Sequence, residues 1–285
     1  MQSCPSPTPA APLLSRTGLH GHIHLTCSVD AIGRSYLSRQ SFNAPFHLSK
    51  SYWDGRTLTV QMINPTAGIL SGDRLCSDVK VEPGGRLSLT TPSATRVYTM
   101  PEGRAEAVQN FSVAGGARLS FVPSMLVPHR HSRYHQASRL TVERGGELLY
   151  LDTLAPGRVA HGESFQYTEL KYELELYWDG HLNARECYHL RPGDDSLIPV
   201  RRLFPHAYWI SGYLITEQLT DSHPAIAAIR ELHCAEAFVG LSRLPYAGWS
   251  IKIIARDSCA LNRTLASLRY ILSHVLQFAA GFSRT

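Results

Sequence analysis

Clustered basic residues are missing from this sequence, and lysine occurs only four times. Arginine therefore supplies most of the formal net charge of +5, and the longest basic run is the pair Arg201-Arg202. Nucleic-acid binding proteins usually gather basic residues into stripes or patches, so this diffuse charge argues against that class. Hydrophobic residues make up 44% of the chain, enough to form a substantial core and to argue against general disorder.

Paired cysteines are also missing. The six cysteines lie far apart in the sequence, and no two form a C-x-x-C pair. This spacing argues against a zinc ribbon and against a disulfide framework. We therefore expect reduced thiols and a cytoplasmic protein.

No apolar run approaches the ~20 residues that a membrane-spanning helix requires, so we expect no membrane association. Residues 1–16 are rich in Pro, Ser and Ala and lack the basic start and apolar core of a secretion signal. We expect a flexible tail there. Residues 17–285 are expected to form a single domain, because all-β folds reach this length as one unit.

Common local signatures of enzymes do not occur in the chain. There is no G-x-S-x-G nucleophile elbow, P-loop, dinucleotide fingerprint after a strand, or H-E-x-x-H helix. Their absence favours a non-enzymatic protein, although many active sites have no local motif.

Short alternating segments and turn residues dominate from about residue 18 to residue 209, which predicts a mainly β protein. The clearest segment runs from Leu170 to Trp178, where apolar and charged residues alternate. Asp179-Gly180 then offers a tight turn, and the alternation resumes from Leu182 to Leu190. This pattern predicts an antiparallel hairpin.

A valine, a glycine pair and a leucine recur three times within this β-rich part. The second glycines, Gly85, Gly116 and Gly146, are 31 and 30 residues apart. One interpretation is a strand, turn and strand unit repeated three times, which would build a solenoid-like fold or a layered sheet of short strands. The other is that the glycine pairs mark three ordinary hairpins.

Two helices are predicted in the C-terminal third. The first begins near Ser222-His223-Pro224, with Pro224 near the first helical position. Its expected apolar positions are Ile226, Ile229, Leu232 and Val239. The second has the stripe Leu261, Leu265, Leu268, Leu272, Val275 and Ala279, with Gly281 as a stop. A strand is expected between them at Ser250–Ala255. The stripe is either packed on the sheet of this protein or a docking surface for a helical partner.

Two groups of histidines are weak candidates for a metal site, because three converging imidazoles bind transition metals. On a strand, His20, His22 and His24 would project from one face. The second group falls in a Pro-bounded, Arg-rich stretch interpreted as a loop and comprises His129, His131 and His135. Neither group has a carboxylate or thiol at ligand spacing, so a solvated strand face and a polar loop are the plainer interpretation, and no tightly bound metal is expected.

Two ordered motifs in the first half resemble the paired signature of the UreD (UreH) family of urease accessory proteins. The first is the turn-rich stretch from Asn64 to Leu75, and the second runs from Thr90 to Tyr98. Further similar pieces follow in order: Leu119-x-x-Val122-Pro123, Asp152-Thr153-Leu154, Pro156-Gly157-Arg158, Asp179-Gly180 and Arg185-Glu186. The chain departs from the family pattern at Ala67, Ser71 and Arg96, where the family usually has Gly, Gly and Lys.

The resemblance implies a β-rich protein without enzymatic activity that supports nickel insertion into apo-urease. It implies a complex with a UreF-like protein and a UreG-like GTPase, docking of that complex onto apo-urease, and passage of Ni²⁺ through an internal, water-filled channel. No cofactor would be permanently bound, because Ni²⁺ would be in transit. Carried over by position, the residues lining such a path are Asp73, Thr95, Asp152 and Glu186.

Strand parity bears on two of these residues. Glu186 shares its strand parity with Leu182, Ala184, Tyr188 and Leu190, so it should point to the apolar side of its sheet. Asp152 ends the apolar run from Leu148. A buried carboxylate needs either a cationic partner such as arginine or a hydrated path used by a cation. Two other functions stay open: an interaction module built on a β-solenoid that has no link to metal, and a metallohydrolase built on the two histidine groups.

Overall fold

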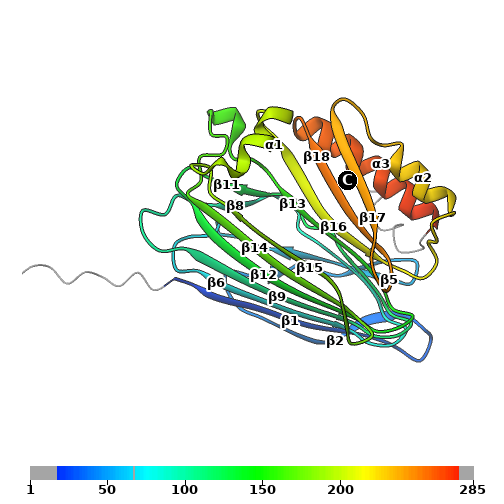
Figure 1. Cartoon of the computed structure of the whole chain (residues 1–285). Coiled ribbons are helices and arrows are strands. Elements are labelled where there is room, and N and C mark those ends of the chain that lie inside the picture. Colours follow the sequence, from blue (N-terminus) through cyan, green and yellow to red (C-terminus); the bar gives the residue numbers. More distant parts are fainter. Residues whose placement is uncertain (1–17, 67, 276–285) are drawn as a thin grey trace, which may run out of the picture.

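A computed structural model describes residues 18–66 and 68–275 of the chain. The expected tail at residues 1–16 lies outside the described residues, as do Ala67, Ala279 and Gly281. The protein is mainly β, as predicted, and is built from two facing sheets with helices on one side (Figure 1).

The first sheet has seven strands, and its five middle strands, from β14 to β1, run parallel. Its order is β15 (His181–Leu190), β14 (Glu169–Trp178), β12 (Arg133–Val142), β9 (Ala105–Val113), β6 (Arg74–Val81), β1 (His20–Val29) and β2 (Ser35–Phe42).

The second sheet has eleven strands, with β13, β10, β7 and β5 parallel to one another. Its main order is β17 (Ala237–Arg243), β18 (Trp249–Ala255), β16 (Tyr208–Ile215), β13 (Glu147–Leu154), β10 (Arg118–Phe121), β7 (Arg86–Thr90), β5 (Thr57–Ile63) and β3 (His47–Leu48). The short strands β4 (Tyr52–Asp54), β8 (Thr95–Val97) and β11 (Leu126–Pro128) pair beside this path.

The threefold repeat corresponds to three stacked coils. Val81 pairs with Val113, and Val113 pairs with Val142, in the seven-stranded sheet. Leu119 lies between Leu87 and Leu148 in the eleven-stranded sheet. The glycine pairs are therefore not hairpin turns, because each carries the chain from one sheet to the facing sheet. This confirms the solenoid-like interpretation.

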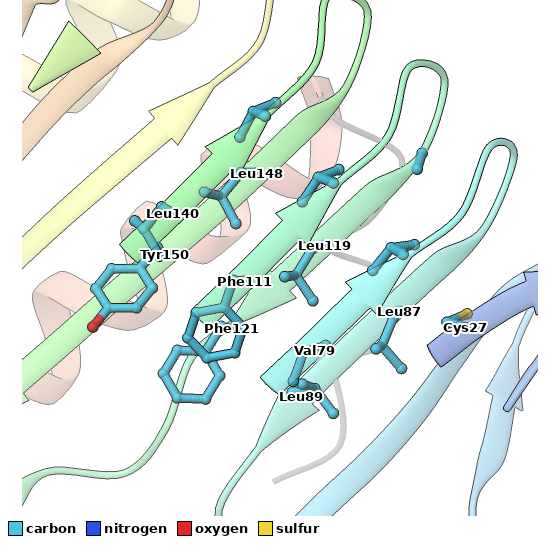
Figure 2. Close-up of a cluster of buried hydrophobic side chains, with 14 of the residues drawn as sticks. Cys27, Val79, Leu87, Leu89, Phe111, Leu119, Phe121, Leu140, Leu148 and Tyr150 are labelled. Carbon is cyan, nitrogen blue, oxygen red and sulfur yellow. The ribbon is translucent and has the colours of Figure 1, made fainter. Parts of the chain in front are cut away.

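The interior between the sheets is filled by rows of side chains stacked one coil above another. Leu89, Phe121 and Tyr150 form one such row in the eleven-stranded sheet, and Phe111 reaches it from the facing sheet (Figure 2). The rings of Phe121 and Tyr150 stack at 5.5 Å between centroids. Such packing supplies both burial and aromatic contacts, so the interior is solid where these rows meet.

The predicted hairpin is present as β14 and β15, with φ of 49° at Asp179 and 80° at Gly180. A bulge next to Leu176 shifts the register, so Asn183 has no strand partner and is buried, while Leu182 is 46% exposed. Leu182 was expected to share the inward parity of Glu186. The bulge reverses the faces of Leu182 and Asn183 relative to the rest of the strand.

Three α-helices occur among the described residues: α1 (Ile198–Leu203), α2 (Pro224–Arg230) and α3 (Ser258–Val275), besides the 3₁₀ turns Val159–His161 and Asp195–Leu197. The two predicted helices are α2 and α3, whereas α1 is too short to show periodicity. Helix α2 ends before Leu232, and Val239 lies in β17. The helices α2 and α3 pack on the outer face of the eleven-stranded sheet through a second apolar core (Figure 1).

Candidate functional site

A polar cluster interrupts the apolar interior where β13 passes β16. The period-two alternation of β13 turns Leu148, Tyr150 and Asp152 inward, so the carboxyl group of Asp152 enters the space between the sheets. Asp152 stands opposite Ser211 of β16 in the strand register. The sequence therefore places one acid at the end of a row that is otherwise apolar or aromatic.

Neutral hydrogen-bond donors surround the Asp152 carboxyl group. Gln136 Nε2 donates to Asp152 Oδ2 at 2.5 Å, and the Tyr150 hydroxyl donates to the same oxygen at 3.3 Å. Burial raises the pKa of Asp152 to about 6, although these two hydrogen bonds oppose the rise; the negative charge of Glu186 adds to it. Asp152 therefore keeps its proton to a higher pH than an exposed aspartate does.

Glu186 projects inward from β15 and meets a cation. Lys252 Nζ, from β18, donates to both carboxylate oxygens of Glu186 at 2.6 Å. Ser211 Oγ and the Tyr213 hydroxyl donate to Glu186 Oε2 at 2.6 and 2.8 Å. Burial alone would raise the pKa of Glu186, but Lys252 and the two hydroxyls outweigh it and hold the pKa below its usual value. Glu186 is ionised, and its partner is a lysine, whereas an arginine was the expected alternative.

Asp152 and Glu186 line one small cavity of about 10 Å³, close to the least volume that holds a water molecule. Its polar walls come from four strands and comprise Gln136, Ser138, Tyr150, Asp152, Glu186 and Ser211. The rest of the lining comes from Tyr172, Glu173, Leu174 and Tyr188. Burial raises the pKa of both tyrosines well above the usual value, so their hydroxyls stay neutral donors. The Tyr172 hydroxyl has no hydrogen-bond partner within the described part of the chain.

A hollow of about 350 Å³ lies on the outer face of the seven-stranded sheet, next to this cavity. It forms because Val108, Ala137 and Cys187 are short beside the longer Arg139 and Arg185. The hollow and the cavity share four lining residues, namely Ser138, Glu173, Leu174 and Glu186. The cavity and the hollow therefore adjoin each other at strands β12, β14 and β15.

Asp73 lies elsewhere and binds backbone. Its Oδ1 accepts a hydrogen bond from the Leu19 N–H at 2.9 Å, and its Oδ2 accepts one from the Leu70 N–H at 2.8 Å. Only 2% of its surface is exposed, and it lines neither the cavity nor the hollow. The carboxylate therefore holds the Leu70 turn against the start of β1.

Thr95 lines a third space, a pocket of about 300 Å³ between the two signature motifs. The motifs are joined by two backbone hydrogen bonds, from Ile69 to the Arg96 carbonyl and from Tyr98 to the Ile69 carbonyl. Gly68 has φ of +154°, and a Cβ there would lie 2.6 Å from the Arg96 oxygen, so glycine is required. The structure brings Asp152 and Glu186 together and leaves Asp73 and Thr95 outside their cavity.

The sequence model of the UreD urease accessory protein family matches residues 19–284. This chain belongs to the UreD family. It is 44% identical to the urease accessory protein UreD of Opitutus terrae, over 89% of this chain and 94% of that protein. It is 25% identical to UreD of Acetivibrio thermocellus, over 84% and 92% of the two chains. The UreD of a Staphylococcus aureus strain is also 25% identical, over 79% and 83%. These relatives are named as accessory proteins, in line with a maturation factor that is not an enzyme.

The histidine groups of this UreD-family chain do not converge. The ring centroids of His22 and His24 lie 4.7 Å apart on the outer face of β1, as predicted, and His24 Nδ1 lies 3.0 Å from Asp78 of the neighbouring strand. Among residues 18–66 and 68–275, no group of three or more His, Cys, Asp or Glu side chains is arranged to hold a metal ion. No helix in the same ranges is long and apolar enough to cross a bilayer.

The second histidine stretch is not one loop, contrary to the prediction. His129 is 4% exposed against Tyr98, and His131 adopts a positive φ of 59° in the turn. His135 lies inside β12, on its outer face near Glu169. Inward and outward residues alternate from Arg133 onward, and this alternation indicates a strand. The neighbouring proline and arginines instead favoured the interpretation as a loop.

Sequence reasoning missed Gln136, Ser211 and Lys252 as parts of the site. Lys252 had a recognisable signal, because it stands between Ile251 and Ile253 inside a predicted strand. A lone charge in an apolar strand indicates a buried partner, as it did for Glu186. Pairing the two required the tertiary structure, since 66 residues separate them.

Proposed function

We propose that this UreD-family protein assists urease maturation by letting Ni²⁺ pass between its two sheets, with Asp152 and Glu186 as transient ligands. The observation that carries the proposal is the convergence of two carboxyl groups from different sheets on one polar cavity inside an apolar core. Burying carboxyl groups costs free energy, which a passing divalent cation would offset.

The chemistry of the lining favours transit over storage. The oxygen donors are carboxylates, tyrosine hydroxyls and serine hydroxyls, and no imidazole or thiol lines the cavity. Ni²⁺ binds nitrogen and sulfur ligands more tightly than such oxygens, so it would exchange quickly here. Of the three carboxylates in the lining, Glu173 pairs with Lys171 and is half exposed, so Asp152 and Glu186 are the two that supply interior charge, which keeps the site weak.

The outer hollow offers an approach to the cavity, because the two share the wall formed by Ser138, Leu174 and Glu186. Thr95 would line a separate stretch of the route in its own pocket, and Asp73 would serve by holding the signature loop in place. Movement of side chains must join these spaces for an ion to pass.

The partners proposed for this transfer are a UreF-like protein, a UreG-like GTPase and the subunits of apo-urease, in the cytoplasm. The family assignment supports the link to urease, because the related chains are named urease accessory proteins. Ni²⁺ is cargo in this scheme, and no cofactor stays bound.

The test replaces each cavity carboxyl in cells that express urease with its accessory proteins. Asp152→Ala and Glu186→Gln should each lower urease activation by about tenfold, because each removes a ligand from the path. Urease activity and nickel content of purified urease are the measurements. Asp221→Ala is the matched control, since Asp221 pairs with Arg243 at the surface and should have no effect.

Co-purification of the accessory proteins with each variant separates transit from assembly. We expect complexes of normal composition for Asp152→Ala and Glu186→Gln. Full activation by both variants would contradict the transit mechanism and leave a scaffold without a metal role.

A further inference from the structure

Lys252 occupies the position that a cation bound to Glu186 would take. Its Nζ lies 2.6 Å from each Glu186 oxygen and 2.6 Å from Ser211 Oγ. It also lies 5.0 Å from the centroid of the Tyr213 ring. The oxygens that would ligate a hard cation at this end of the cavity are therefore already directed at an ammonium group.

This ammonium is not sealed inside the protein. The Lys252 side chain is 41% exposed, compared with 23% for Glu186. Gly240 stands opposite Lys252 on β17, and a Cβ at Gly240 would meet no atom closer than 3.8 Å. The flexible four-carbon stem of lysine can therefore swing the ammonium into open space beside Gly240 without a change of backbone.

Glu186 needs a positive partner, because its side chain is only 23% exposed and an unpaired carboxylate in such a place is costly. Lys252 supplies that partner, with its Nζ 2.6 Å from each carboxylate oxygen. Exchange of one cation for another keeps Glu186 paired, so it is favoured over departure of the ammonium alone.

We propose that Lys252 is the resident counter-ion of Glu186, and that a divalent cation binds by displacing the ammonium toward solvent beside Gly240. This inference rests on the proposed function and adds how the affinity of the site is set. Lys252 competes with the cation, so it keeps binding weak and returns to Glu186 when the cation leaves.

The first experiment measures binding of Ni²⁺ alone to the full-length chain by equilibrium dialysis. Lys252→Met keeps the length of the side chain and removes the competing charge, so one class of site should bind Ni²⁺ about tenfold more tightly than in the wild type. The double variant Lys252→Met with Glu186→Gln should lose this gain. Lys80→Met is the matched control, because Lys80 is an exposed lysine beside Glu82, and it should bind as the wild type does.

The second experiment uses the unaltered protein and so does not depend on a variant that folds. The lysine amines are acetylated with and without Ni²⁺, and the label on each of the four lysines is measured by mass spectrometry. Acetylation of Lys252 should rise severalfold with Ni²⁺, while acetylation of Lys80 stays constant.

Equal Ni²⁺ affinity of Lys252→Met and wild type, or unchanged acetylation of Lys252, would overturn the counter-ion role. Neither result would contradict the proposed function, which is tested separately by urease activation with Asp152→Ala and Glu186→Gln. Displacement of Lys252 by Ni²⁺ together with full activation by those variants would instead show a cation site that has no part in maturation.

Discussion

Burial of a single residue, Asp152, links the stability of this protein to pH. Its folded pKa is raised to about 6, whereas an aspartate in an unfolded chain has a pKa of about 3.9. Between these values the unfolded chain releases the proton and the folded chain retains it. Stability therefore falls as pH rises through this window and stays lower above pH 6. The stabilisation that comes from the protonated carboxyl group is fully present only below the pKa of the unfolded chain, about 3.9.

Asp152→Asn should consequently stabilise the protein at pH 7.5 by about 1–3 kcal/mol, because the amide cannot ionise. At pH 4 the variant and the wild type should be equally stable. Urea denaturation at several pH values between 4 and 7.5 measures the difference. A stability gap that does not change with pH would show that ionisation of Asp152 is not its cause. Such a gain in stability alongside a loss of urease activation would fit a residue kept for function.

At the scale of elements, the three turns between the sheets share one backbone requirement. The third residue after each repeat valine is Gly84, Gly116 or Gly145, and its φ is +78°, +72° or +75°. This left-handed conformation is costly for residues that carry a Cβ. The glycine pairs therefore hold the sharp corners of the stacked coils, and the register of the valines and leucines follows from them.

Gly116→Ala should lower the free energy of unfolding by about 1 kcal/mol, because alanine is strained at the positive φ of this position. A Cβ at Gly116 would meet no other atom, so the backbone conformation is the sole source of this cost. Gly193→Ala is the matched control, since its Cβ is equally free and its φ is not positive. That variant should be neutral or slightly stabilising. Urea midpoints of the two variants give the comparison. Equal midpoints would mean that the turn tolerates a side chain.

At the scale of the whole molecule, two apolar cores share one sheet. Strand β13 turns Leu148 and Tyr150 toward the facing sheet and Leu149 and Leu151 toward the helices. The helices α2 and α3 and the solenoid-like coils are thus joined through the same backbone. We expect them to unfold together, as one domain.

Leu268→Ala should destabilise the protein by about 2–5 kcal/mol, because Leu268 is fully buried between α3 and the eleven-stranded sheet. Tyr270→Ala should change stability by less than about 0.5 kcal/mol, since 67% of Tyr270 is exposed. Far-UV circular dichroism and tyrosine fluorescence should follow one shifted transition. Separate transitions for the two probes would contradict the single-domain expectation.

Local signals were sufficient for several parts of this structure. The alternation from Leu170 to Leu190 predicted the β14–β15 hairpin, and Pro224 with the stripe around Leu268 predicted helices α2 and α3. Parity also predicted the inward direction of Glu186. Where a bulge intervened, as at Asn183, parity failed for Leu182, because one extra residue reverses the face of a strand.

The sequence by itself determined the strand periodicity, the glycine corners and the presence of lone charges in apolar strands, because these depend on neighbours along the chain. Only the tertiary structure decided that the glycine pairs join two sheets, that Asp152 and Glu186 meet at one cavity, and that Lys252 neutralises Glu186. These outcomes depend on the stacking of coils, which brings together residues 34 and 66 positions apart. Contacts at such separations are fixed by the register between strands, and no local pattern specifies it.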